Sequence, residues 1–254
     1  MSVASTLAFR ALAFGDVDGR LWGAAVQSAQ AGLAFGSGDS SRVAPAPEWT
    51  VEDRAWSLSG DGFELHVEPR GETPAEPDGE SSSDSDAPAD VRGLQELCRV
   101  HGRISLDGVE QIVDCGGART EVDGLKPDAI ASARVVSGWF GPDEAITVIA
   151  LRAPRARDHE ADLIAATLFD ASGWVAVSDP RLSTTYTEAG DPARASLELW
   201  VPEAENEFPR RAAGESTGPR VAFTVGELAL RVAPMRCHSR GLEGAGVYVL
   251  ATLQ

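Results

Sequence analysis

The sequence has little positive charge, and almost all of it is arginine. Its 254 residues contain 22 Lys and Arg side chains against 39 Asp and Glu, which gives a formal net charge of −17 at pH 7, and Lys126 is the only lysine. Nucleic-acid backbones and anionic membrane surfaces are bound through clustered positive charge. The composition therefore argues against nucleic acid and against an anionic membrane as partners.

Long apolar runs are also absent. No stretch approaches the roughly 18 uninterrupted apolar residues that indicate a transmembrane helix. Residues 1–19 have no basic segment before their apolar part, and Arg10 interrupts that part, so no signal peptide is predicted. Three cysteines, an odd number, do not indicate a disulfide framework. We expect a cytoplasmic protein without a membrane span and with reduced thiols.

The sequence motifs that most directly indicate a catalytic, nucleotide-binding or redox site are missing as well. The chain has no GxSxG, no P-loop and no CxxC. The glycine-rich run 241–246 precedes a predicted strand and lacks the strand–helix context of a dinucleotide site, so it is interpreted as a flexible turn. The sequence therefore predicts no cofactor.

What the chain does have is β-strand patterning. Its hydrophobic content of 43% is enough for a real core. Short apolar or alternating runs are separated by turn signals, and no segment has a convincing helical pattern, which predicts an antiparallel all-β protein. Besides the hairpin described next, the predicted strands are 5–14, 20–35, 54–59, 63–68, 131–139, 145–152, 161–169, 174–177, 194–201, 221–225, 227–232 and 247–253.

The clearest element is a β-hairpin within residues 94–124. Asp107-Gly108 is a strong signal for a two-residue type I′ turn, in which both central residues have positive φ. With this turn, opposing residue numbers sum to 215, and His101 lies opposite Asp114 on a charged outer face. The inner face then carries Cys98, Val100, Gly102, Ile104 and Leu106 opposite Val109, Gln111, Val113, Cys115 and Gly117.

Residues 70–90 differ in composition from the rest of the chain. They hold seven acidic residues, one arginine and no aromatic or large aliphatic side chain. Such a segment buries too little apolar surface to offset its ordering entropy, so we expect an acidic disordered linker or loop insertion. The expected organisation is an N-terminal β half (1–69), this linker (70–90) and a C-terminal β-barrel-like half (91–254). Because 69 residues are few for a closed barrel, the second half is expected to lend strands to the first.

Three clusters of reactive side chains are candidate sites. Residues 158–162 (DHEAD) crowd four metal-ligand types together but have no second histidine at a ligand spacing, and they are interpreted as solvated loop charges. Cys237 and His238 are adjacent on a strand and therefore point to opposite faces. His101 and Asp114 have the chemistry of a base with an orienting carboxylate, but a charge pair on an outer sheet face is the simpler interpretation. No catalytic residue and no metal ligand is predicted.

Aromatic side chains on strands give the one candidate binding site. Aromatics at a barrel mouth commonly bind flat apolar ligands, and ordinary core packing is the alternative. The predicted ligand-binding residues are Trp22, Trp139, Phe140, Trp174 and Trp200.

From residue 93 onward, the order of features resembles the hydroxyneurosporene synthase (carotenoid hydratase)/AttH-like group. The matching elements are Val100–Asp107, Val109–Val113, Gly116–Arg119, Gly124–Asp128, Trp139-Phe140 and Gly244–Tyr248. This resemblance implies two lipocalin-like β-barrels in tandem, and the group includes carotenoid hydratases and lipocalin-type cyclases.

The resemblance does not extend to the group's hallmark, a His-Ser-Trp-Gly run followed by Arg-Asp. Residues 121–128 read EVDGLKPD at that place, without the His, Trp or Arg. No catalytic residue is therefore carried over, since likeness of fold does not imply likeness of function.

Three functions stay open on the sequence. The first is a non-catalytic lipocalin-like protein that binds a hydrophobic small molecule, isoprenoid or lipid-like. The second is an isoprenoid-modifying hydratase or cyclase that uses a buried carboxylic acid as proton donor. The third is a β-sandwich interaction module without a small-molecule pocket.

Overall fold

The computed structural model describes residues 7–16, 21–27, 32–37, 40–70, 96–125, 130–141, 144–156, 162–201, 208–218 and 220–254. Every regular element within these ranges is a β-strand, and every pairing is antiparallel, so the predicted all-β antiparallel fold is confirmed. No helix in this part of the chain is both long and apolar enough to cross a bilayer. The expected linker at 70–90 lies, except for Arg70, outside the described residues.

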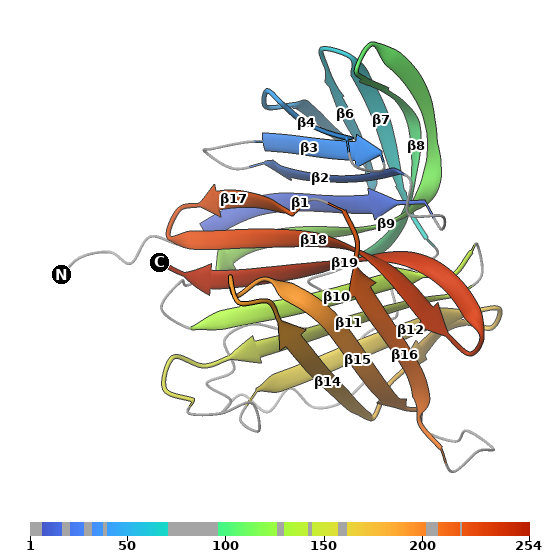
Figure 1. The fold of residues 1–254 in the computed structure, drawn as a ribbon, viewed down its shortest axis with the longest axis vertical. Helices are drawn as coiled ribbons and strands as arrows, with labels where there is room; N and C mark the ends of the chain where they lie inside the picture. Colours follow the sequence, from blue (N-terminus) through green and yellow to red (C-terminus); the bar gives the residue numbers. More distant parts are fainter. Residues whose placement is uncertain are drawn as a thin grey trace.

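The first sheet has nine strands in the order β4-β3-β2-β1-β9-β8-β7-β6-β5 (Figure 1). Its strands are β1 (Leu7–Gly15), β2 (Leu21–Gln27), β3 (Gly32–Ser37), β4 (Ser40–Ala44), β5 (Glu48–Glu52), β6 (Ala55–Gly60), β7 (Phe63–Pro69), β8 (Glu96–Leu106) and β9 (Val109–Leu125).

The second sheet has ten strands in the order β13-β12-β11-β10-β19-β18-β16-β15-β14, with β17 paired to β18. Its strands are β10 (Ser132–Trp139), β11 (Ala145–Arg152), β12 (Leu163–Asp170), β13 (Gly173–Ala176), β14 (Asp179–Tyr186), β15 (Pro192–Trp200), β16 (Arg210–Ser216), β17 (Val221–Val225), β18 (Leu228–Ser239) and β19 (Leu242–Leu253).

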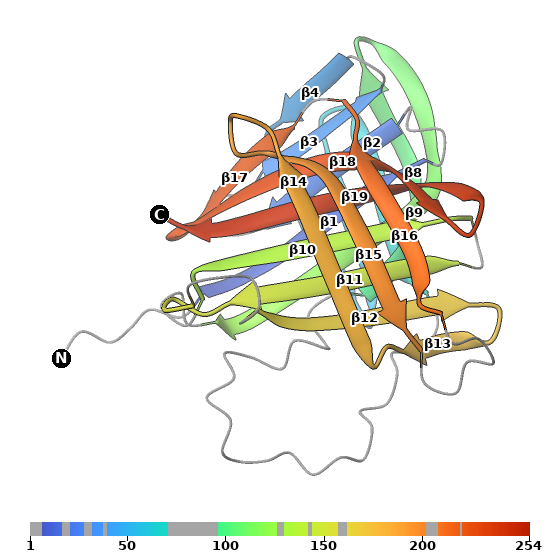
Figure 2. The same cartoon turned by 60° about the horizontal axis from the view of Figure 1, so that its bottom comes forward.

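Each sheet curls into a half-barrel around its own core (Figures 1 and 2). Leu12, Phe14 and Leu65 belong to the core of the first half-barrel, and Val148 and Tyr248 to that of the second. Both concave sides are therefore filled by packed side chains. This is the two-half, lipocalin-like arrangement that the sequence predicted.

The half-barrels pack against each other through the outer faces of β1 and β9 on one side and of β10 and β19 on the other (Figure 2). Small side chains line this contact, among them Ala13, Ala118 and Ala245. Successive residues of a strand face opposite sides, so β1 sends Leu12 and Phe14 inward and Ala13 outward. The alanine-rich segments of the sequence thus let two sheets approach closely.

The change from one sheet to the other falls after β9, later in the chain than the expected linker. Strands β8 and β9 pair with β7 and β1 and so complete the first sheet. The region after residue 91 therefore contributes strands to the N-terminal half, and these are the two strands of the predicted hairpin.

The hairpin itself has the predicted register. Pairs run from Leu106 opposite Val109 to Glu96 opposite Arg119, all summing to 215. Asp107 has φ 54° and Gly108 has φ 79°, the positive values that a type I′ turn requires.

Several strand predictions are wrong in detail. The single strand expected at 20–35 is two paired strands, β2 and β3. The glycine-rich run 241–246, which was expected to be a turn, is a turn only at its start, because β19 begins at Leu242. Strands β4, β5, β14 and β16 were not expected. β14 is largely polar and exposed, so it carries no apolar alternation that could reveal it.

Candidate functional site

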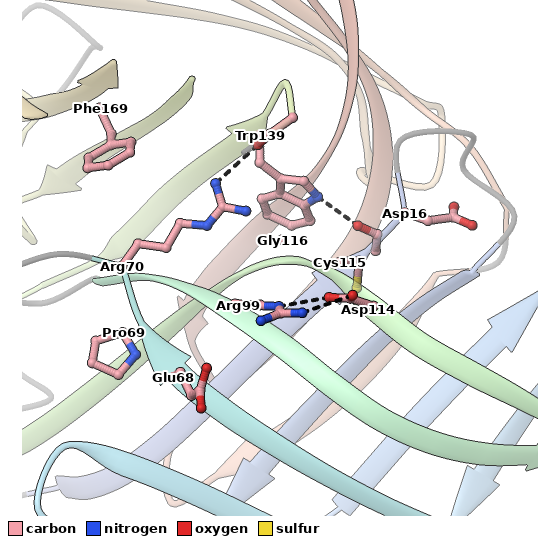
Figure 3. A pocket seen from close by; sticks show the side chains of 12 residues that line it. Asp16, Glu68, Pro69, Arg70, Arg99, Asp114, Cys115, Gly116, Trp139 and Phe169 are labelled. Carbon is pink, nitrogen blue, oxygen red and sulfur yellow. Dashed lines mark hydrogen bonds and ion pairs between the residues drawn. The ribbon is translucent and has the colours of Figure 1, made fainter. Parts of the chain in front are cut away.

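A cleft lies where the two half-barrels meet (Figure 3). Its volume is about 670 Å³. It forms where β1, β7 and β10 end, beside β8, β9 and β12. The lining residues are Gly15, Asp16, Glu68, Pro69, Arg70, Arg99, Asp114, Cys115, Gly116, Trp139, Gly141 and Phe169.

One wall of the cleft is aromatic and comes from the C-terminal half-barrel. Trp139 is the last residue of β10, and its Nε1 donates a 2.7 Å hydrogen bond to the carbonyl oxygen of Gly15 in the other half-barrel. A Cβ on Gly116 would lie 2.5 Å from the indole, so only glycine leaves room for this ring. Phe169 stands on β12 and meets Trp174 edge to face, with ring centroids 5.3 Å apart.

The opposite wall is charged and comes from the N-terminal half-barrel. Arg99 donates two hydrogen bonds to Asp114, of 2.8 and 3.0 Å (Figure 3). These bonds hold the pKa of the Asp114 carboxyl below its ordinary value, so this group is an anion at neutral pH. Arg99 and Asp114 neutralise each other, so this pair adds little net charge to the wall.

The sequence placed His101 opposite Asp114, and the register confirms that pairing. The side chains do not form a base–carboxylate pair, because Arg99 occupies the carboxylate. His101 instead stacks on His66 with ring centroids 5.3 Å apart, and its Nε2 lies 3.5 Å from Glu68. The interpretation of His101 as part of an outer charged face therefore holds.

Two further polar side chains reach the cleft from strand ends. Arg70 follows β7 and donates a 3.1 Å hydrogen bond to the carbonyl oxygen of Gly141, which ties the two half-barrels together (Figure 3). Asp16 follows β1, is half-buried, and accepts a 3.0 Å hydrogen bond from the backbone N–H of Leu21.

The cleft also contains a thiol, Cys115 on β9. Burial raises its pKa to about 12, and the nearby Asp16 carboxylate raises it further, while a backbone hydrogen bond with Gly15 opposes the shift. A thiol with this pKa is almost fully protonated at neutral pH and is not a nucleophile. Cys98, on the same strand pair, is fully buried and its pKa is also raised by burial.

The structure separates the predicted ligand-binding residues. Trp139 lines the cleft between the half-barrels, and Trp174 supports it through Phe169. Phe140 lines a different cleft on the C-terminal half-barrel. Trp22 is buried, Trp200 is half-buried, and neither lines one of these two clefts.

The sequence interpretation missed Phe169, Arg70 and Asp16 as lining residues. Their shared signal was their position in or just after a strand, close to its end, where loops and strand ends commonly build sites. The sequence could not show which strand ends meet, since these three residues belong to both sheets.

Of the acidic cluster at 158–162, the structure describes only Asp162, and the solvated interpretation is wrong for it. The Asp162 side chain is 1% exposed and pairs with Arg134 at 2.6 Å and with Arg152 at 2.8 Å. Over the described ranges, no three His, Cys, Asp or Glu side chains are grouped so as to hold a metal ion. Cys237 is buried and His238 is exposed, on opposite faces of β18 as predicted.

No family model matches the sequence, and no curated protein sequence matches it either. Solved structures do match. An AttH-like protein from Nitrosomonas europaea is 12% identical with a TM-score of 0.61, covering 99% of this chain and 94% of that one. CghA with Sch210972 is 13% identical with a TM-score of 0.62, covering 98% and 89%. Kievitone hydratase from Nectria haematococca is 7% identical with a TM-score of 0.54, covering 98% and 90%.

These similarities run over nearly the whole chain and establish the fold. The chain has the two-half, lipocalin-like fold of these solved structures, as the sequence resemblance implied. At such low identity, the activities of these proteins are not transferred with the fold.

Proposed function

We propose that this protein binds a flat, largely apolar small molecule in the cleft between its half-barrels. The observation that carries the proposal is the pairing of an aromatic wall, Trp139 and Phe169, with a charged wall that includes Arg70 and Arg99, around a volume of about 670 Å³. Ligand sites are typically clefts of about 300–1,000 Å³ with apolar walls and a few convergent polar groups.

The two walls define the chemistry of the ligand. A ring system fits the aromatic wall through face and edge contacts. A carbonyl or hydroxyl group at one end of the ligand fits the polar side chains of the opposite wall. One similar solved structure, CghA, holds the small molecule Sch210972, which supports small-molecule binding on this fold.

The test is a titration of the full chain with isoprenoids, fatty acids and polycyclic ketones, with tryptophan fluorescence as the readout. Phe169→Ala removes one aromatic surface of the cleft and is expected to weaken binding about tenfold or more. The matched control is Phe208→Ala, since Phe208 is 80% exposed and does not line the cleft. Binding that is lost equally in both variants, or that is absent with every ligand, would count against the proposal.

A second candidate is an isoprenoid hydratase or cyclase, with Asp16 as the proton donor. Asp16 is the half-buried carboxyl of the cleft, whereas Arg99 keeps Asp114 ionised and so unsuited to donate a proton. In hydration, the acid gives its proton to an alkene carbon, water adds to the resulting cation, and the water's extra proton returns to the carboxylate. Kievitone hydratase, among the similar structures, supports this alternative.

Asp16→Asn separates the two candidates. The amide keeps the size and the acceptor oxygen of the carboxyl but cannot donate a carboxylic proton. If the protein is a hydratase, wild type adds one water to the mass of its alkene substrate, and the variant binds that substrate without converting it. Turnover that survives in the variant contradicts the catalytic role of Asp16, and binding without turnover in wild type supports the non-catalytic function.

A further inference from the structure

Strand β5 is an open edge of the first sheet. It pairs with β6 alone, and no other described strand runs alongside it. Four of its five residues are exposed, namely Glu48, Thr50, Val51 and Glu52. In the described structure, space is therefore left beside β5 for one more strand.

The register of β5 and β6 shows which backbone groups are available at this edge. Glu52 and Ala55 flank the two-residue turn of the hairpin, so they exchange backbone hydrogen bonds with each other. Because bonding alternates along an antiparallel pair, the N–H and C=O groups of Trp49 and Val51 point away from β6. No hydrogen bond from another described residue reaches them. An added strand can bond to these four groups.

The inner face of this edge is apolar. Trp49 packs against the core of the first half-barrel and meets Trp56 edge to face, with ring centroids 5.6 Å apart. Val51 is 39% exposed and, together with Trp56, lines a cleft of about 280 Å³. An apolar side chain of an added strand would cover Val51 at the mouth of this cleft.

The outer face of the same edge is acidic. Glu48 and Glu52 alternate with Trp49 and Val51 and therefore point to the opposite side. Both carboxylates are exposed, and neither forms a hydrogen bond or ion pair with a described residue. Their neighbours on β6 are Ser59 and Ala55, which carry no charge. The negative charge along β5 is therefore not compensated within the described structure.

The other three strands at the ends of the two sheets are less suited to accept a partner. β13 has only four residues. β14 contains Pro180, which has no backbone N–H, and its Asp179 and Arg181 pair with each other. β4 has no acidic residue. Among these strands, only β5 combines an open edge with carboxylates that have no partner.

A second copy of this chain does not fit the edge. Antiparallel pairing of two β5 strands about Thr50 would place Glu48 of one copy directly opposite Glu52 of the other, and like charges in that position are destabilising. The net charge of −17 opposes self-association further. A strand with basic side chains on its outer face has the complementary charge.

We infer that β5 is the docking edge for an extended segment of a basic partner protein. The segment adds antiparallel to β5 and alternates apolar residues with Lys or Arg. Its backbone bonds to Trp49 and Val51, and its apolar side chains cover the inner face of the edge. Its basic side chains lie opposite Glu48 and Glu52. None of these residues lines the cleft between the half-barrels, so the inference goes beyond the proposed function.

The experiment measures fluorescence anisotropy of a labelled, acetylated peptide, Lys-Val-Lys-Val-Lys-Val-Lys, titrated with the full chain. Salt at about 150 mM screens general attraction to the acidic surface. The control peptide Lys-Lys-Val-Val-Val-Lys-Lys has the same composition and charge but no alternation, and it should bind at least about tenfold more weakly. Equal binding of the two peptides, or no binding of either, overturns the inference.

Two methylated peptides test the backbone bonds without changing the protein. In the alternating peptide the amides of all valines point to one side, and those of all lysines to the other. The valines share the inner face with Val51, so their amides face β5. N-methylation of the valines should therefore abolish binding, whereas N-methylation of the lysines should preserve it. Equal effects of the two modifications contradict strand addition.

Val51→Pro tests the same bonds from the protein side. The N–H that proline removes points away from β6, so no hydrogen bond within the chain is lost, and binding should weaken about tenfold or more. The matched control is Val43→Pro, which places proline on β4 at the other edge of this sheet, where Val43 is 77% exposed. Unchanged binding by Val51→Pro, or equal losses in both variants, overturns the inference.

A pair of double variants tests the charges. Glu48→Gln with Glu52→Gln should weaken binding about threefold or more. Glu198→Gln with Glu215→Gln changes the net charge equally at exposed sites on the other half-barrel and should have less effect. Equal effects overturn the role of the β5 carboxylates. Sedimentation of the chain alone tests the second copy, and a wild-type dimer that Val51→Pro abolishes would overturn the assignment of a basic partner.

Discussion

The indole N–H of Trp139 donates its hydrogen bond to the Gly15 carbonyl across the contact between the two half-barrels, at 2.7 Å. Trp139 is 2% exposed, so neither partner can turn to water instead. The same ring forms one wall of the large cleft. The side chain that joins the halves is therefore also the side chain that shapes the proposed binding site.

Trp139→Phe should destabilise the fold, because it leaves the Gly15 carbonyl buried without this donor. The loss of a buried hydrogen-bond partner costs about 1–3 kcal/mol. Urea unfolding of the variant against wild type measures this difference.

Trp22→Phe is the matched control for that experiment. Trp22 is 4% exposed, and its Nε1 is buried without a hydrogen-bond partner in the described structure. Its replacement removes the same N–H group but breaks no hydrogen bond, so the destabilisation should be smaller. Equal destabilisation by the two variants would show that ring volume, and not the hydrogen bond to Gly15, decides the cost.

The hairpin was predictable because everything that fixes its register is local. Asp107-Gly108 sets the turn, and alternation over the flanking residues sets the buried face. The sequence placed Trp139 and Phe140 in one predicted binding site. It could not indicate which part of the folded chain each ring packs in, because the neighbours of the two rings come from strands far away in sequence.

The burial of Asp162 could not be predicted for the same reason. Its partners Arg134 and Arg152 are 28 and 10 residues away, and they meet it only after β10, β11 and β12 have paired. In sequence, Asp162 belongs to a run of charged residues that is typical of a solvated loop. The position of a charge in a sheet protein depends on pairings that a local pattern does not contain.

Asp162→Asn should be strongly destabilising. The substitution removes the only negative charge of this ion cluster in the described structure and leaves Arg134, which is 5% exposed, without charge compensation. Breaking a buried ion pair by removing one partner costs about 3–5 kcal/mol. Asp179→Asn is the control, because its pair with Arg181 is exposed and should matter little. Urea unfolding of both variants checks the prediction, and a small effect of Asp162→Asn would contradict it.

Asp170 should make stability depend on pH in the acid range. Hydrogen bonds from Ser172 and Arg210 lower the pKa of its carboxyl in the folded state. A lowered folded pKa means that the stabilisation is present above the unfolded pKa, about 3.9, and is lost as the pH falls through the folded pKa. The difference in unfolding free energy between wild type and Asp170→Asn should be constant above about pH 5 and shrink below about pH 4. Unfolding measured from pH 3 to pH 7 tests this, and a difference that grows toward low pH would refute the assignment.

Cys115 should react slowly with thiol reagents, although it lines the large cleft. With a pKa of about 12, only about one Cys115 in ten thousand is a thiolate at pH 8, against roughly a quarter of ordinary thiols. Alkylation by iodoacetamide, followed by peptide mass analysis, should therefore be roughly a thousandfold slower in the folded chain than in guanidinium.

The dependence of the alkylation rate on pH separates the two causes of slow reaction. A thiol that is slow because of its pKa gains about tenfold in rate per pH unit to beyond pH 10, whereas a thiol that is only hard to reach levels off near pH 9. A plateau near pH 9 would mean that the packing around Cys115, and not its raised pKa, protects it.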